Sequence, residues 1–125
     1  MSQLVIIREQ YEKALARLQE VLQLPFSEVV RDSAIQRFEF TVDLAWKTMK
    51  AYLVEVKGIT CTSPKDCVRL AHLHGLIEYD DSWLELIDLR NETAHTYHEE
   101  LAARIYSELP RTVEIFQKLL IKLNN

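Results

Sequence analysis

The chain has 125 residues, a length that serves one hydrophobic core, so we expect a single domain over residues 1–125. Apolar residues make up 48% of the sequence and charged residues 27%, which is typical of a folded globular protein and excludes a disordered one. Only two glycines occur, so the glycine-rich loops that bind dinucleotides or nucleotide phosphates are excluded. No cofactor is expected.

The net charge of −4 is distributed unevenly along the chain. Residues 47–69 carry five basic and two acidic side chains, whereas residues 78–108 carry nine acidic and two basic ones. This balance argues against tight, sequence-indifferent binding of nucleic acid, although the first segment offers a local basic strip for weak contact with RNA.

No membrane span or secretory signal is recognisable in the sequence. The longest stretch without Asp, Glu, Lys or Arg is the eight residues 70–77, against the ~18–20 residues that a membrane helix needs. Residues 1–10 lack the basic segment and the small-residue cleavage site of a signal peptide. We therefore expect a cytoplasmic protein that does not contact the membrane.

The two cysteines, Cys61 and Cys67, are separated by five residues. That spacing matches neither the usual zinc pairing nor a disulfide-rich scaffold. Because only two cysteines occur and a cytoplasmic location is expected, we predict that both are free thiols.

Apolar residues spaced three and four positions apart predict that helices occupy most of the chain. The first such stripe begins at Leu4 and continues to about Leu24. Pro25 ends this first helix, and Ser27 can cap the next helix at its N-terminus.

The second helix is predicted to be the longest, at roughly 30 residues or about 45 Å. It has a core row with a seven-residue repeat from Ile35 to Val56, and a second apolar row formed by Phe40, Leu44 and Ala51. Packing inside a small bundle needs only the first row. The second row therefore predicts a partner chain, and we expect a homodimer.

Glycine and proline mark the ends of the third helix. Gly58 and Gly75 are expected in the left-handed conformation just past the second and third helices. Between them, Ser63-Pro64 has the pattern of a cap residue followed by proline at the first helical position. The third helix is therefore short.

Two Ser/Thr-x-x-Glu patterns, starting at Ser82 and Thr96, resemble capping boxes. They predict a fourth helix that ends near His95 and a fifth helix that begins at once. Pro110 is expected to kink or briefly break the fifth helix. With no alternating strand pattern, the sequence predicts an all-α, up-and-down helical bundle of four long helices and one short one, assembled as a homodimer.

One polar segment, Leu89 to Tyr97, falls at the predicted joint between the fourth and fifth helices. Arg90 and His95 would lie ~140° apart on an unbroken helix, so they can share a site only if the helix ends between them. Asn91 and His95 are four residues apart, which suits Asn91 to orient the imidazole or a bound phosphate.

Arginine and histidine suit chemistry at a phosphodiester. Arg90 offers planar, permanently charged donors to phosphate oxygens, and His95 titrates near neutrality and can transfer a proton. An RNA strand brings its own nucleophile, the 2′-hydroxyl, so no metal ion is required. A two-fold dimer would bring a second Arg90 and a second His95 to the same cleft, and would thus supply both an acid and a base.

The run Arg90-Asn91-Glu92-Thr93-Ala94-His95 resembles the R-x4–6-H motif of HEPN-domain proteins. With Tyr97 it resembles the R-x4-H-x-Y form of the HepT toxins and of the related nucleotidyltransferase substrate-binding subunits. The resemblance extends to the long second helix, the S-P-K-x-x-x-R-x-A segment from Ser63 and the W-L-E-L-I-D-x-R-N-E run from Trp83.

This resemblance implies a homodimeric toxin of a toxin-antitoxin pair, encoded beside a minimal nucleotidyltransferase. It implies that Arg90 and His95 form a metal-independent endoribonuclease, and that the partner adenylylates Tyr97 and so silences it. Tyr97 would lie in the first turn of the fifth helix, where unpaired N–H groups and the helix dipole favour an added phosphate.

Other interpretations remain open at the level of the sequence. The first is a non-catalytic subunit that binds substrate or nucleotide for the partner enzyme. The second is a purely structural dimer, in which Arg90 and His95 only stabilise a helix C-terminus and Tyr97 only closes a corner between helices. A metal site at His95, His98 and Glu99 is disfavoured because a third ligand at defined spacing is missing.

Overall fold

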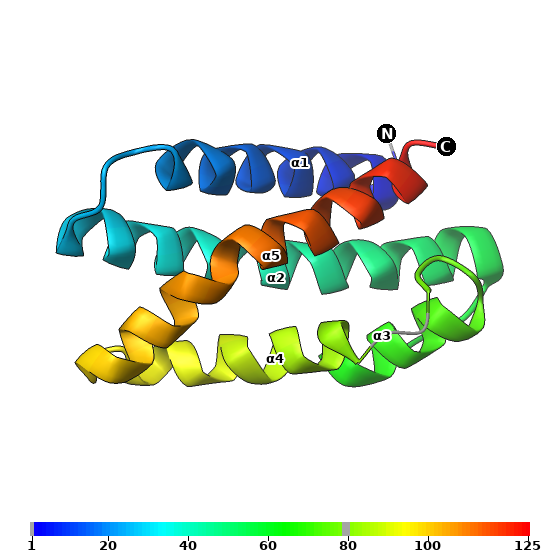
Figure 1. Ribbon diagram of the computed structural model, residues 1–125. Helices are drawn as coiled ribbons and strands as arrows, with labels where there is room; N and C mark the ends of the chain where they lie inside the picture. The colour runs from blue at the N-terminus through cyan, green and yellow to red at the C-terminus, as the bar shows by residue number, and fades with distance from the viewer. Residues whose placement is uncertain (1, 79–80) are drawn as a thin grey trace.

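The computed structural model describes residues 2–78 and 81–125, and Figure 1 shows that it is built from helices. Its elements in chain order are α1 (Gln3–Leu22), α2 (Glu28–Tyr52), a π-helical turn (Leu53–Lys57), α3 (Pro64–Leu73), α4 (Ser82–Glu92), a 3-10 turn (Thr93–His95) and α5 (Glu99–Leu123). No strand occurs in these two described ranges, so the all-α prediction is confirmed. Within the same ranges, no helix is both long and apolar enough to cross a bilayer.

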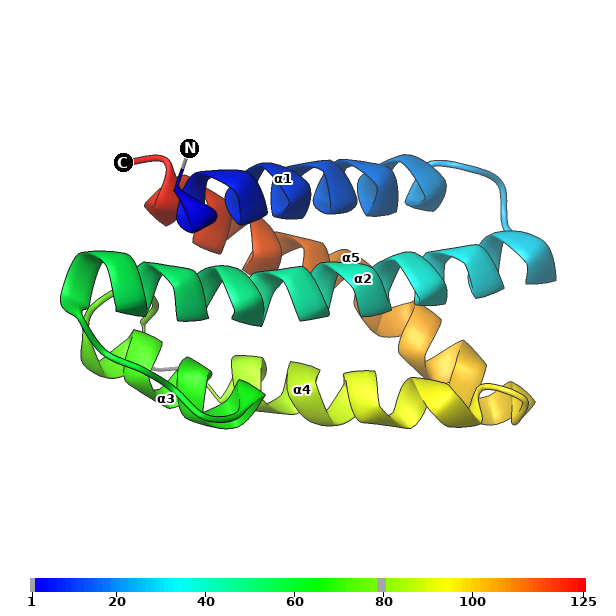
Figure 2. The same cartoon turned by 180° about the vertical axis from the view of Figure 1, so that it is seen from behind.

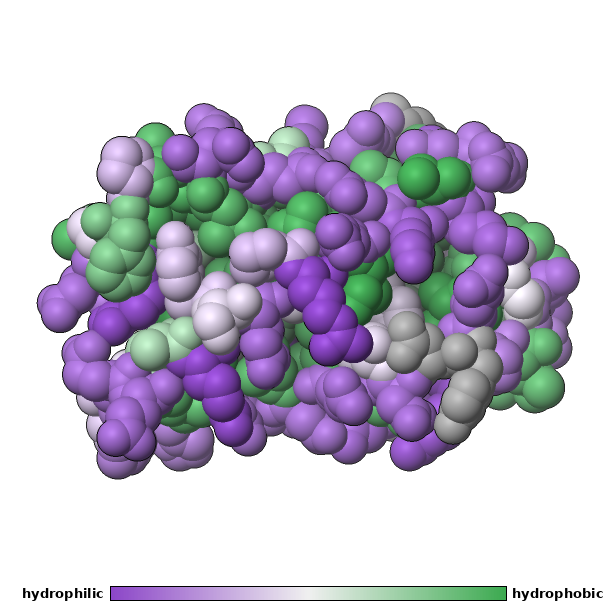
Figure 3. All heavy atoms as spheres, viewed as in Figure 1, coloured by the Kyte–Doolittle hydropathy of each residue, from purple (hydrophilic) through white to green (hydrophobic). Residues whose placement is uncertain are grey.

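Helices α1, α2 and α4 lie side by side, and α5 crosses them diagonally on one face (Figure 1). On that face, polar side chains cover most of the surface and apolar side chains are exposed between them (Figure 3). Seen from behind, α2 runs between α1 and α4, with α5 on its far side and α3 at its C-terminal end (Figure 2). The face of α2 that looks away from α5 is not covered by any described helix.

Several helix ends follow the predicted signals. The side-chain oxygens of Ser27 and Ser63 accept hydrogen bonds from the backbone N–H groups of residues 30 and 66, at 3.0 and 3.2 Å. Gly58 and Gly75 both have positive φ, at 68° and 80°, where a side chain would be strained. The first helix ends at Leu22, slightly earlier than expected, and α2 with its π-helical turn covers the predicted 30 residues.

The two predicted capping boxes are wrong. Ser82 lies inside the first turn of α4, and its buried Oγ accepts a hydrogen bond from Nη2 of Arg111 at 3.2 Å. The hydroxyl of Thr96 donates to the carbonyl oxygen of Thr93 at 3.2 Å, and α5 begins only at Glu99. In both places the side chain has another partner, so the local pattern does not decide where the helix begins.

Helix α5 continues through Pro110, so the predicted break does not occur. Proline removes one backbone hydrogen bond from a helix. The helix remains continuous because apolar residues on both sides of the proline are buried in the same core, namely Ile105, Leu109, Val113 and Phe116.

The prediction of two free thiols is also wrong, because the structure joins Cys61 and Cys67 in a disulfide. After Gly58 the chain turns back to the N-terminus of α3, which brings the two Cα atoms within 5.0 Å of each other. Both cysteines are buried beside Leu53 in a small apolar cluster. Spacing along the sequence did not reveal the pairing because the geometry of this loop creates it.

The core contains a group of aromatic rings around Phe116 of α5. The ring centroid of Phe116 lies 6.2 Å from that of Tyr11 on α1, 6.4 Å from that of Phe38 on α2 and 5.8 Å from that of Trp83 on α4. All four side chains are buried. The hydroxyl of Tyr11 donates to the carbonyl oxygen of Phe116 at 2.7 Å, and burial raises the pKa of Tyr11. One residue of α5 thus contacts all three helices of the layer.

Candidate functional site

The polar segment lies where α4 ends, as predicted. The helix changes to a 3-10 turn at Thr93–His95. The hydroxyl of Thr93 donates to the carbonyl oxygen of Arg90 at 2.6 Å, so this side chain satisfies one of the carbonyl groups that a helix end leaves unpaired. The helix therefore ends between Arg90 and His95, which is the condition that the two residues need to share one site.

Arg90 extends from α4 to Asp43 on α2. Its Nε and Nη2 donate to the two carboxylate oxygens of Asp43, at 3.0 and 3.1 Å, in a bidentate pair. About a third of each side chain is exposed, at 31% for Arg90 and 35% for Asp43. The pair uses one N–H of Nε and one of Nη2, so the remaining N–H groups, on Nη1 and Nη2, can meet a further acceptor such as a phosphate oxygen.

The surroundings of Arg90 are acidic. The pKa of Arg90 is raised, first by its hydrogen bonds to Asp43 and then by the charges of Asp43 and Glu39, while partial burial opposes this shift. Glu92, at the end of the same helix, pairs with Arg104 of α5. The guanidinium charge of Arg90 is thus permanent, but neighbouring carboxylates largely balance it.

His95 and Tyr97 are both exposed, Tyr97 by 74%. The hydroxyl of Tyr97 lies 3.4 Å from Nδ1 of His95, and the two rings meet edge to face with centroids 6.0 Å apart. The Tyr97 ring also lies 4.6 Å from that of His98. Asn91 is exposed as well, and no hydrogen bond joins it to His95 among the described residues. In this structure the imidazole contacts Tyr97.

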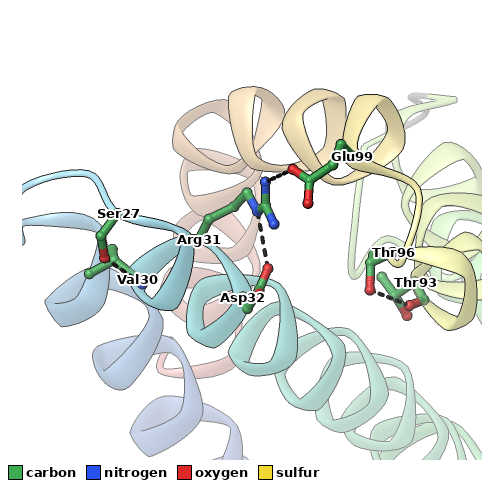
Figure 4. Close-up of polar contacts among 7 residues, drawn as sticks. All are labelled: Ser27, Val30, Arg31, Asp32, Thr93, Thr96 and Glu99. Atoms are coloured by element: carbon green, nitrogen blue, oxygen red, sulfur yellow. Dashed lines mark hydrogen bonds and ion pairs between the residues drawn. The ribbon is translucent and has the colours of Figure 1, made fainter.

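An ion pair that the sequence analysis missed fixes the start of α5 (Figure 4). Arg31 of α2 donates from Nε to Asp32 at 3.0 Å and from Nη1 to Glu99 at 2.7 Å. Only 7% of the Arg31 side chain is exposed, so a buried guanidinium holds the first residue of α5. The hydrogen bond and charge of Arg31 lower the pKa of Glu99. The loop with His95 and Tyr97 is thereby held between two anchored helix ends.

The structure thus brings the predicted residues to one end of the molecule but directs them to different partners. Arg90 is directed to α2, whereas His95 and Tyr97 contact each other on the loop. The residues that sequence reasoning missed, Asp43 and Arg31, lie on α2, more than 45 positions before their partners. No motif marks them, since their contacts depend on how α2 packs against α4 and α5.

The exposed groups define what this site can do. A guanidinium with N–H groups still available can bind a phosphate oxygen, an exposed imidazole can transfer a proton, and an exposed phenol can accept a covalent group. No group of three or more His, Cys, Asp or Glu residues that could hold a metal ion occurs among residues 2–78 and 81–125.

Comparisons with known proteins agree with this fold. The family model described as "Nucleotidyltransferase substrate binding protein like" matches residues 8–125. A solved structure from Thermus thermophilus has a TM-score of 0.86 and 42% sequence identity, and the match covers 92% of this chain and 99% of that one. A Haemophilus influenzae structure, described as revealing the fold of a substrate binding domain of a nucleotidyltransferase, has a TM-score of 0.71 and 27% identity, with 98% and 97% covered.

One protein with a similar sequence is named for an enzymatic activity. A Haemophilus influenzae protein called "Probable ribonuclease HepT" is 38% identical over 80 residues. That alignment covers 61% of this chain and 55% of the relative, so it spans about half of the relative's length.

The fold defines a class of small all-helical proteins. The chain belongs to the family of nucleotidyltransferase substrate-binding-like proteins, as the match to residues 8–125 shows. The expected resemblance to this family is confirmed.

Proposed function

We propose that this protein is a HepT-like, metal-independent endoribonuclease that acts as the toxin of a cytoplasmic toxin-antitoxin pair with a minimal nucleotidyltransferase. Two copies of the chain form the cleft in which RNA is cut. The observation that carries the proposal is the joint after α4, where a permanently charged Arg90 and an exposed His95 lie on either side of a helix end. The similarity to a probable ribonuclease supports the same activity.

The roles of the residues follow from their chemistry. Nη1 of Arg90 binds a phosphate oxygen and stabilises the charge that grows in the transition state. One His95 takes the proton of the RNA 2′-hydroxyl, which attacks the adjacent phosphorus, and the other His95 gives a proton to the departing 5′-oxygen. The products are a 2′,3′-cyclic phosphate and a 5′-hydroxyl, so the protons balance and no metal ion takes part. Asn91 assists by orienting the imidazole or the bound phosphate.

Cleavage of RNA in the presence of a chelator tests the proposal. We expect the purified protein to cut single-stranded RNA in EDTA, and His95→Ala to lower the rate by about 10²–10⁴-fold, the usual contribution of general acid–base catalysis. His98→Ala is the matched control, because it removes a neighbouring exposed imidazole that has no assigned role. Equal, negligible cleavage by the wild-type protein and by His95→Ala would contradict the proposed nuclease activity.

Tyr97 is the residue that we propose the partner enzyme adenylylates. Its phenol is exposed and lies beside the imidazole, so an attached AMP would occupy the space around His95. Co-expression with the nucleotidyltransferase should add the mass of AMP to the intact protein and abolish cleavage, and Tyr97→Phe should stay unmodified and active. Tyr106→Phe is the control. A mass gain that persists in Tyr97→Phe would contradict this assignment.

A second candidate function is a non-catalytic subunit that binds substrate or nucleotide for the partner enzyme. The observation that favours it is the bidentate pair with Asp43, which occupies two of the three nitrogens of Arg90, together with the acidic surroundings. The RNA cleavage assay in EDTA distinguishes the two functions. The adaptor binds nucleotide or RNA but leaves RNA intact in EDTA, with or without His95.

A further inference from the structure

A pocket of about 430 Å³ lies between the C-terminal half of α5, the segment that follows α3 and the first turn of α4 (Figure 1). Trp83, which lines it, precedes His95 by twelve positions, or about 18 Å along a helix. The pocket is therefore separate from the candidate site at the other end of α4. Its volume is within the range of ~300–1,000 Å³ that is typical of pockets for small molecules.

The apolar part of the pocket wall is mostly aliphatic. Leu76, Ile77 and Leu119 are buried residues that line it, and Ile115 is half-buried. Trp83 is only 4% exposed, so its ring offers little surface on which a planar base could stack. This wall therefore suits an alkyl chain better than a flat aromatic ring.

Trp83 also contributes a polar group that has no partner. Its indole N–H donates no hydrogen bond within residues 2–78 and 81–125. Every buried side-chain nitrogen in those ranges does have a partner, so this N–H is reached by solvent although the residue is almost wholly enclosed. Tryptophans in such positions normally pair their N–H. An acceptor oxygen of a molecule in the pocket would supply the missing partner.

Two lysines give the pocket a positive charge. Lys118 and Lys122 line it one turn apart on α5, both are exposed, and neither forms an ion pair with another described residue. The acidic residue among the described lining residues is Glu78, so two lysines and one glutamate leave a net charge of +1. That balance matches the single charge of a carboxylate better than the charge of nearly −2 on a phosphate monoester.

We propose that this pocket binds an aliphatic carboxylate. The alkyl chain packs on the aliphatic wall, and the carboxylate oxygens accept hydrogen bonds from Lys118, Lys122 and the indole N–H of Trp83. At about 30 Å³ for each water-sized group, the pocket holds about fourteen non-hydrogen atoms, which is the size of dodecanoate. The inference does not depend on the proposed ribonuclease activity.

A chain-length series measured by calorimetry tests the fit. The probes are octanoate, decanoate, dodecanoate and tetradecanoate, each below the concentration at which it forms micelles. We expect each added CH₂ to tighten binding by about fourfold, which corresponds to about 0.8 kcal/mol, up to dodecanoate and little beyond it. AMP and inorganic phosphate should bind at least about tenfold more weakly than dodecanoate. No binding of any carboxylate, an affinity independent of chain length, or tighter binding of AMP would overturn the proposal.

Substitutions of the lysines test the carboxylate contact. Lys118→Gln with Lys122→Gln should weaken dodecanoate binding by about five- to tenfold, as expected for two solvent-exposed ion pairs. The same variant should bind decan-1-ol, which lacks the charge, as the wild-type protein does. Lys47→Gln with Lys50→Gln is the matched control, because it removes two exposed lysines one turn apart on α2 that do not line the pocket. An equal loss in both double variants would mean that only the overall charge of the protein matters.

The two tryptophans of the chain report where the carboxylate binds. In a ¹⁵N–¹H spectrum, dodecanoate should move the indole N–H resonance of Trp83 and leave that of Trp46 in place, and Trp46→Phe assigns the two signals. His95→Ala should bind dodecanoate as tightly as the wild-type protein, so the pocket and the ribonuclease can fail separately. A Trp83 resonance that stays in place at saturation would overturn the assignment to this pocket.

Discussion

Replacing Phe116 with alanine is expected to lower the free energy of unfolding by about 3–5 kcal/mol, because the substitution opens a cavity where four helices meet. The ring contacts Tyr11, Phe38 and Trp83 on the three other helices of the layer. A domain of this size is stable by only about 5–15 kcal/mol, so this loss is a substantial fraction of the total.

Urea denaturation followed by circular dichroism measures this loss. Ile121→Ala is the matched control, since Ile121 lies on the same helix but is 62% exposed, and its loss should stay within about 0.5 kcal/mol. Trp83, which packs against Phe116, also reports the change through its fluorescence. A loss below about 1 kcal/mol for Phe116→Ala would mean that α5 does not pack on the layer through this ring.

Replacing Arg90 with alanine is expected to reduce RNA cleavage by about 10²–10³-fold, the typical effect of removing one donor to the transition-state charge. Arg90→Lys should lose nearly as much, because lysine keeps the charge but not the planar pair of donors that holds Asp43. The effect on stability should be small, about 0–1 kcal/mol, since a third of the ion pair is exposed to water.

Cleavage rates in EDTA and unfolding curves on the same samples separate the two roles of Arg90. Arg104→Ala is the control, because it removes an exposed arginine that pairs with Glu92 on the same side of the joint. Asp43→Asn adds a second comparison, since it removes the negative charge and one of the two acceptor oxygens of the pair while the guanidinium of Arg90 remains. If Arg90→Ala cleaves RNA at the wild-type rate and only its stability changes, the residue serves to hold α4 against α2.

Local signals predicted much of the fold. The period of apolar residues placed the helices, and Gly58, Gly75 and Ser63 marked helix ends where the structure has them. These features depend on the conformation of a few adjacent residues, which the local sequence determines. The capping boxes at Ser82 and Thr96 failed for the converse reason, because Arg111 and a neighbouring carbonyl group competed for the same side chains.

In the candidate site, too, the local sequence determined some features and the tertiary structure determined the others. The sequence by itself determined that Arg90, His95 and Tyr97 fall at the end of a helix, since a short motif and its helix termination are local. Only the tertiary structure decided that Arg90 faces Asp43, that Arg31 anchors Glu99, and that Cys61 and Cys67 are bonded. Each of these contacts requires the register between packed helices or the course of a loop. That register results from the summed packing of the whole core, and no short stretch of residues contains it.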